Sequence, residues 1–243
     1  MPSMNSYEPM KEVELVAEPR TSFELELFAS AQNWKKHWSA SMIRHLRGAV
    51  VEVGAGIGSN SEHLLSSGIE QLTSLEPDEQ LFSVLSARNT ARRVTCVRGT
   101  LADLDQKFDS IVYIDVLEHI EDDESETSCA YDHLTTGGNL IILAPAWQFL
   151  FSPFDHAVGH YRRYTRASLR SVVDPRLETV SEKYLDSVGL LASLGNRVFL
   201  SSSVPTRRQI EFWDSVMMPL SGALDPLLRY SVGKTVLGVY RRP

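Results

Sequence analysis

The chain has 243 residues, of which 43% are hydrophobic and 23% are charged, and its formal net charge is −7. This ordinary globular composition and length suit a domain with a sizeable core. The acidic balance argues against a nucleic-acid-binding protein, which usually presents a basic face. No apolar run reaches membrane-spanning length, and no signal-peptide core is evident near the start of the sequence.

The two cysteines, Cys96 and Cys129, fall in a predicted strand and a predicted helix. Neither has a partner at metal-ligand spacing, and two cysteines do not indicate a disulfide framework. We therefore expect a reducing, cytoplasmic setting and predict no metal site.

The first segment, residues 1–20, is polar and is interpreted as a mobile arm. A helix in one or two pieces follows over Phe23–Leu46, because apolar residues recur there every three or four positions. These residues are Phe23, Leu27, Ala31, Trp34, Trp38, Met42 and Leu46. The stripe is compatible with core packing, or with a lid whose Trp34 and Trp38 contact a substrate. We assign residues 1–46 to an arm and lid, and residues 47–243 to one catalytic domain.

The central motif is VVEVGAGIGS, which begins at Val50. A β-branched run is followed by glycines at positions 54, 56 and 58, and then by the polar start of a predicted helix reaching about Ser67. This order predicts a strand, a tight turn and a helix N-terminus. Glycines without a Cβ let a ligand lie against the backbone, and the free N–H groups of the helix start face it.

Two acids distinguish this motif from a dinucleotide fingerprint. Glu52 lies near the strand end, where it would repel a pyrophosphate and attract a cationic ligand. Glu76 ends the next apolar run, where a carboxylate suits the two hydroxyls of a ribose. The pair fits S-adenosylmethionine better than NAD. A plain glycine-rich surface turn is the alternative interpretation.

The rest of the chain alternates between predicted strands and helices, which indicates a parallel sheet covered on both faces. The predicted strands are Gln71–Leu75, Val94–Val97, Phe108–Ile114 and Leu140–Leu143, and the predicted helices cover Asp78–Asn89 and Ser125–Leu134. Asp78 is expected to cap the first of these helices, and a turn is predicted at Gly137–Gly138.

Two short segments follow predicted strands at the edge where open α/β sheets hold ligands. After the third strand, residues 98–103 (RGTLAD) are compatible with an adenine contact or with a plain turn. After the fourth strand, residues 115–119 (DVLEH) place Asp115 near the cofactor's amino-acid end. His119 is a candidate general base, although a lone histidine is more often structural.

The segment Ala144–Arg170 is long, aromatic and basic in an acidic protein. Loops of this length are commonly functional, and arginines among aromatic rings suit a carboxylate, a phosphate or a sugar acid. Pairing of the arginines with the acidic run at 118–126 is the alternative. Thr165 is expected to cap a helix that reaches Val173.

Together, VEVGAGIGS, LEPD, DVLEHI and GGNLIILAP resemble the class I S-adenosylmethionine-dependent methyltransferases over about residues 48–185. The segment FSPFDHAVGHYRRYTRASL resembles a subgroup of bacterial small-molecule methyltransferases. The resemblance implies an α/β, Rossmann-like, doubly wound sheet of seven strands whose last strand is antiparallel. The sixth and seventh strands would be Glu178–Leu185 and Lys234–Arg241.

The resemblance also implies the cofactor's contacts by position. Those residues are Glu52, Gly54, Ala55, Gly56, Gly58, Glu76, Pro77, Thr100, Leu101, Asp115 and Val116. Many members of the family carry an aspartate where this chain has Thr100, so Asp103 is a possible substitute.

We therefore predict methyl transfer from S-adenosylmethionine to the oxygen, nitrogen or carbon of a small molecule, anionic or sugar-like. The candidate bases, in order, are His156, His160, Tyr161 and His119. The candidate substrate contacts are Trp34, Trp38, Trp147, Phe151, Tyr161, Arg162, Arg163 and Tyr164. The alternatives are a lipid-linked acceptor and a nicotinamide-binding protein.

A helical insertion is expected over residues 189–231, where two apolar clusters are broken by prolines. It is compatible with pocket cover, with self-association or with a membrane surface, of which we favour the first two. The protein is expected to be a monomer or a homodimer.

Overall fold

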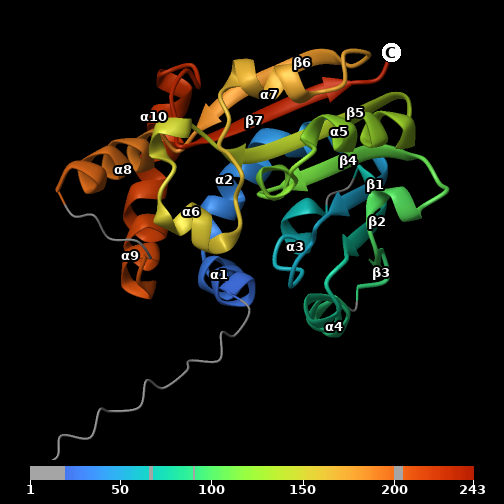
Figure 1. Ribbon diagram of the computed structural model, residues 1–243, viewed down its shortest axis with the longest axis horizontal. Coiled ribbons are helices and arrows are strands. Elements are labelled where there is room, and N and C mark those ends of the chain that lie inside the picture. Colours follow the sequence, from blue (N-terminus) through green and yellow to red (C-terminus); the bar gives the residue numbers. More distant parts are fainter. Residues whose placement is uncertain (1–19, 66–67, 90, 200–204) are drawn as a thin grey trace, which may run out of the picture.

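A computed structural model describes residues 20–65, 68–89, 91–199 and 205–243. Seven strands form one sheet in the order β3-β2-β1-β4-β5-β7-β6 (Figure 1). The strands are β1 (Gly48–Val53), β2 (Ile69–Glu76), β3 (Val94–Arg98), β4 (Phe108–Ile114), β5 (Leu134–Pro145), β6 (Glu178–Leu185) and β7 (Thr235–Arg241). β7 alone runs antiparallel, between β5 and β6. The predicted fold class is therefore confirmed.

Helices flank the sheet, and short 3₁₀ turns and one π-helical turn connect or extend them. The α-helices are α1 (Arg20–Ala29), α2 (Gln32–Met42), α3 (Ser61–Leu64), α4 (Glu79–Arg88), α5 (Asp123–His133), α6 (Pro153–Val158), α7 (Arg166–Val172), α8 (Ser187–Phe199), α9 (Arg207–Phe212) and α10 (Met218–Leu227). The 3₁₀ turns are η1 (Ile43–His45), η2 (Leu101–Asp103), η3 (Leu117–His119) and η4 (Gln148–Leu150), and the π turn is η5 (Trp213–Met217).

Two hydrophobic clusters fill the two faces of the sheet. Alternate residues of each strand point to opposite faces, so Val50 joins one cluster and Val51 the other. The first face is covered by α5 and α7. The second is covered by α2 and α10, whose Trp38 and Met218 pack there.

Most local predictions hold within a few residues, including the caps. Asp78 accepts hydrogen bonds at the start of α4, and Thr165 does so at the start of α7. The predicted helix at Phe23–Leu46 is divided between α1, α2 and η1. The predicted arm at residues 1–19, residues 66–67 of a predicted helix and the side chain of Phe23 lie outside the described residues.

The predicted turn at Gly137–Gly138 is wrong, because both glycines lie inside β5. Gly137 has a φ of +75°, which a glycine adopts without steric cost. Backbone hydrogen bonds with Arg242 hold the irregular stretch in place. The strand therefore continues through the glycines, as at a bulge.

Among the described residues, none of the helices combines the length and the apolar character needed to cross a bilayer.

Candidate active site

The glycine loop follows β1 directly and is folded as the motif predicts. Gly54, Gly56 and Gly58 have φ values of +67°, +56° and +76°, a region that favours glycine. A Cβ on Gly54 would lie 2.8 Å from the Val116 side chain. The loop after β1 therefore packs directly on the segment after β4.

The two predicted cofactor acids lie on one face of the sheet. Glu52 pairs in register with Ser74, whose hydroxyl is 3.4 Å from Glu52 Oε2, and Glu76 follows two residues later on the same side of β2. Glu76 accepts hydrogen bonds from the backbone N–H groups of Gly56 (2.8 Å) and Asp78 (3.0 Å). Burial raises the pKa of the Glu76 carboxyl.

A buried lysine that the sequence analysis missed faces Glu52. Lys35 of α2 donates hydrogen bonds to the carbonyl oxygens of Ser59 (2.8 Å) and Ala29 (3.2 Å). Burial lowers the pKa of Lys35 to about 8 and raises that of Glu52 to about 7. The sequence signal for its burial is its position four residues after Ala31, which places Lys35 on the same helical face as the apolar stripe.

The predicted adenine segment is a compact 3₁₀ turn. The Asp103 carboxylate accepts hydrogen bonds from the backbone N–H and the hydroxyl of Thr100, both at 2.8 Å. Leu101 is fully buried in the core, whereas Pro77, at the end of β2, is exposed.

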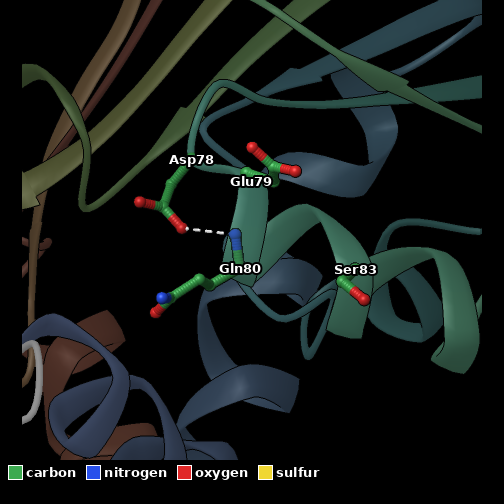
Figure 2. Close-up of a pocket in the computed structure, with 4 residues that line it drawn as sticks. All are labelled: Asp78, Glu79, Gln80 and Ser83. Atoms are coloured by element: carbon green, nitrogen blue, oxygen red, sulfur yellow. Dashed lines mark hydrogen bonds between the residues drawn. The ribbon is translucent and has the colours of Figure 1, made fainter.

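An open hollow lies beside Pro77, at the start of α4. Asp78, Glu79, Gln80 and Ser83 line it, and Figure 2 shows Asp78 accepting the Gln80 N–H. The four residues that line the hollow carry polar side chains, and one of them, Asp78, donates its backbone N–H to Glu76.

Asp115 follows β4 with a φ of +53°, and its backbone N–H donates to the carbonyl of Leu143. Its side chain is open to solvent, yet the surrounding protein limits its hydration and raises the pKa of the carboxyl to about 6. The charges of His160 and Lys234 act in the opposite direction. Asp115 therefore lies among charged side chains.

The aromatic and basic segment 144–170 is folded onto the segment that follows β4. The Tyr161 N–H donates to the carbonyl of Glu118 at 2.8 Å. The buried Tyr164 hydroxyl donates to Asp123 at 2.7 Å and to the Leu117 carbonyl at 3.3 Å. These contacts bring residues more than forty positions apart in the sequence to one edge of the sheet.

Asp155 of α6 is the centre of this arrangement. The fully buried carboxylate pairs with His160 Nδ1 at 2.9 Å and with the Arg163 guanidinium at 2.8 and 3.0 Å. It also accepts from the N–H and hydroxyl of Ser152. Although burial acts to raise it, hydrogen bonds from His160 and Arg163 hold the pKa of Asp155 well below its ordinary value.

His119 and Glu118 meet His160 on the side away from Asp155. The two imidazole rings lie edge to face with centroids 4.5 Å apart. Glu118 is fully buried, and its Oε1 is 3.9 Å from His160 Nε2. Burial, followed by the charge of His160, lowers the pKa of His119 to about 4.

The remaining candidate residues have mainly internal contacts. Arg162 pairs with Asp123. For this arginine, the alternative interpretation, an ion pair with the acidic run at 118–126, therefore holds. Trp147 stacks on Tyr184 and donates its indole N–H to the carbonyl of Gly233.

Three further aromatic candidates, Tyr164, Trp34 and Trp38, are buried in the core. His156 is exposed and packs edge-on against Phe151, and the Tyr161 ring is 51% exposed.

Comparison with known proteins gives a domain match and a fold. Residues 51–140 match the family model described as a methyltransferase domain. No curated protein sequence matches the chain.

Many solved structures match along nearly the full length. A candidate methyltransferase of Haloferax volcanii, solved with the Trm112 methyltransferase activator, has a TM-score of 0.62 at 15% identity, covering 91% of this chain and 93% of its own. A candidate sarcosine dimethylglycine methyltransferase of Galdieria sulphuraria has a TM-score of 0.61 at 14% identity, covering 93% and 98%. A geranyl diphosphate methyltransferase in complex with S-adenosylmethionine has a TM-score of 0.61 at 14% identity, covering 91% of each chain.

The sheet order, the glycine loop after β1 and the matched domain define a class I methyltransferase fold. Residues 51–140 match a methyltransferase domain, and the fold is the one shared by S-adenosylmethionine-dependent methyltransferases.

Proposed function

We propose that this enzyme methylates a small molecule that binds between the glycine loop and the segment 144–170. The observation that carries the proposal is the contact between Gly54 and Val116. It joins the loop predicted to hold the methyl donor to the segment that carries Asp115 and His119, so donor and acceptor sites share one edge of the sheet.

The cofactor's sulfonium end is assigned to Glu52 and the glycine loop, and its ribose to Glu76. Each Glu76 oxygen already accepts one backbone N–H and retains a second acceptor site for a ribose hydroxyl. Leu25 of α1 supports the proposed role of residues 1–46 as a lid, because a Cβ on Gly56 would lie 3.0 Å from it.

The acceptor's attacking atom is assigned to the region of Asp115, His119 and His160. In-line attack on the sulfonium methyl needs positioning and a nucleophile without its proton. Among the candidate bases, His160 has the support of the structure, because Asp155 fixes its ring in the manner of a base and its orienting partner. His156 is exposed on α6 and has no such partner among the described contacts.

Calorimetric titration with S-adenosylhomocysteine tests the cofactor assignment. Glu76→Ala should weaken binding at least tenfold, because it removes a ribose acceptor. Glu70→Ala is the matched control, since Glu70 is an exposed carboxylate at the other end of β2. Equal affinities for the two variants, or binding of NADH without S-adenosylhomocysteine, would refute the assignment.

A lipid-linked acceptor is the second candidate, and an exposed apolar stripe on the insertion favours it. Phe212, Val216, Leu220 and Leu224 recur every four residues along α9, η5 and α10, and each is at least 40% exposed. Arg207 and Arg208 begin α9, where they suit an anionic membrane surface.

Co-sedimentation with anionic vesicles tests the second candidate, with Leu220→Glu as the variant that should stay in the supernatant. Wild-type protein that also stays in the supernatant would reject the membrane. A dimer that Leu220→Glu dissociates would instead assign the stripe to self-association.

A further inference from the structure

Three metal-binding side chains converge from two segments far apart in the sequence. Glu118 and His119 belong to η3, directly after β4, and His160 follows α6. One ligand atom from each lies within 4.8 Å of the other two. No sequence motif indicates this cluster, because only the folding of segment 144–170 onto η3 brings the second histidine to the first.

His160 is held so that one ring nitrogen faces the cluster. Its Nδ1 bonds to Asp155, and its Nε2 faces Glu118 Oε1 at 3.9 Å. Asp155 is itself fixed by Arg163 and Ser152. A carboxylate that orients a histidine from behind is the usual outer support of a metal-binding imidazole.

His119 is positioned by the same fold. Its ring lies edge to face with that of His160, and its Nδ1 is 3.8 Å from the position of a Cβ on Gly159. Gly159 ends α6 with a φ of +88°, and this tight, left-handed turn lets His160 follow immediately. A side chain at position 159 would be strained by this left-handed backbone conformation.

The spacing of the three ligands suits a single ion after a small contraction. Ligands about 2.1 Å from a metal ion are separated by about 3.0–3.4 Å in tetrahedral or octahedral geometry. The 3.9 Å between Glu118 Oε1 and His160 Nε2 exceeds this by less than 1 Å. All three pairs of ligand atoms lie within 4.8 Å, so side-chain rotation has to bring the widest pair closer by less than about 2 Å.

We propose that Glu118, His119 and His160 bind one divalent first-row transition ion, which holds an oxygen atom of the methyl acceptor. Two imidazoles and one carboxylate suit Zn²⁺, Fe²⁺, Co²⁺ or Mn²⁺, whereas Mg²⁺ and Ca²⁺ prefer sites made of oxygen. Three protein ligands leave further coordination positions open, as in catalytic sites. This inference rests on the proposed function.

The charges around the cluster are compatible with a dication. The carboxylates of Asp115, Glu118 and Asp155 surround it, while Arg163 and Lys234 are the cations that act on the same groups. With both histidines neutral, these side chains carry a net charge of −1, and one bound divalent ion would change it to +1.

The bound oxygen would be activated close to the donor. Coordination lowers the pKa of an acceptor hydroxyl, and its proton leaves to solvent. The oxygen then attacks the methyl carbon of the sulfonium as the carbon–sulfur bond breaks, and that bond's electron pair remains on sulfur. The products are the methyl ether and S-adenosylhomocysteine.

Metal titration of the full chain tests the site without a known acceptor. Protein treated with EDTA and dialysed is titrated with Zn²⁺ by calorimetry and with Co²⁺ by visible absorption. We expect one ion per chain, with affinity at least tenfold weaker in His119→Gln and in His160→Gln. Asp155→Asn should weaken binding 10- to 100-fold through the orientation of His160.

His156→Gln is the matched control, because this exposed histidine lies four residues before His160 and outside the cluster. It should keep the wild-type metal affinity within twofold. Acetohydroxamate, an oxygen-donor probe, should shift the Co²⁺ absorption if open positions exist. An unchanged spectrum would refute the acceptor role, and metal binding unaffected by both histidine substitutions would refute the site.

S-adenosylhomocysteine titration of the same samples separates this inference from the proposed function and reports on folding. Wild-type protein that binds the nucleoside and no ion would refute the metal site alone. Protein that binds one ion and no nucleoside would refute the cofactor assignment alone. Each glutamine variant should retain wild-type affinity for S-adenosylhomocysteine, which shows that loss of the ion is not loss of fold.

Discussion

Asp155→Asn is expected to destabilise the protein strongly. The wild-type carboxylate is fully buried and accepts hydrogen bonds from His160, from two nitrogens of Arg163 and from the N–H and hydroxyl of Ser152. The asparagine keeps one oxygen acceptor, but its neutral amide leaves the Arg163 guanidinium, which is only 9% exposed, without an opposite negative charge at this position. Breaking a buried ion pair in this way costs about 3–5 kcal/mol.

We take the lower end, about 3 kcal/mol, because the amide oxygen retains part of the hydrogen bonding. For a chain of this length, that loss corresponds to a fall in Tm of roughly 6–12 °C. Urea unfolding followed by tryptophan fluorescence, with a parallel calorimetric scan, measures both quantities at pH 7.

Asp132→Asn is the matched control. Asp132 also pairs with an arginine, Arg176, but at 3.4 Å and with both side chains about half exposed or more. Exposed pairs of this kind contribute little, so the Tm should stay close to that of the wild type. A similar Tm for the two variants would show that the Asp155 network does not stabilise the fold.

The same network has a defined pH dependence. The folded pKa of Asp155 lies below the ordinary aspartate value of 3.8. Its contribution is therefore present above that pH and is lost as the pH falls below it. The difference between wild type and Asp155→Asn should shrink in acid, and a difference that grows there would contradict the assignment.

Three further changes have defined outcomes. Burial raises the pKa of Glu52 from 4.5 to about 7, so the protonated carboxyl stabilises the fold fully below pH 4.5 and this contribution is lost as the pH rises through 7. In Glu52→Gln, the free energy of unfolding from urea titrations should lose this pH dependence, which amounts to at most about 3 kcal/mol. Gly54→Ala should cost about 1–3 kcal/mol by urea unfolding, since its Cβ meets Val116, and Val116→Ala should recover part of the loss. Asp214→Ala should cost about 1–2 kcal/mol in the same assay, because Asp214 caps the N-terminus of α2; a smaller loss than in an exposed Asp105→Ala control would refute the cap.

Strands were the features most directly predictable from the sequence. The predicted span Phe108–Ile114 is the strand observed, because a run of apolar residues indicates a buried strand. The span Glu178–Leu185, also observed, came from the family resemblance. The order of the sheet came from the resemblance rather than from periodicity. Local patterns carry little information about which strands become neighbours.

The glycines at 137 and 138 show why a correct local signal gives a wrong element. A left-handed glycine is needed in a tight turn and also in a strand bulge. Hydrogen bonds with Arg242, more than one hundred residues later, decide between the two. That information is absent from the local sequence.

The candidate site was predictable only in its separate parts. Asp115, His119 and His160 were recognised individually, from strand ends and residue chemistry. Their meeting depends on contacts across about forty residues, whereas the contact of Asp155 with His160 spans only five. Arginines in a basic segment likewise give no sequence signal of whether they face a ligand or an internal carboxylate.

The insertion before β7 is hydrogen-bonded to the helix that contacts the glycine loop. Asp214 of η5 accepts the backbone N–H groups of Asn33 and Trp34, and Asp225 of α10 pairs with His37 at 2.8 Å. Both acids therefore fix α2, the helix whose Lys35 donates to the carbonyl of Ser59 at the end of the glycine loop. Asp225 also accepts the backbone N–H groups of Asp186 and Ser187, directly after β6. A displacement of α10 would therefore act on α2 and on the end of β6 together, because one buried carboxylate joins all three elements.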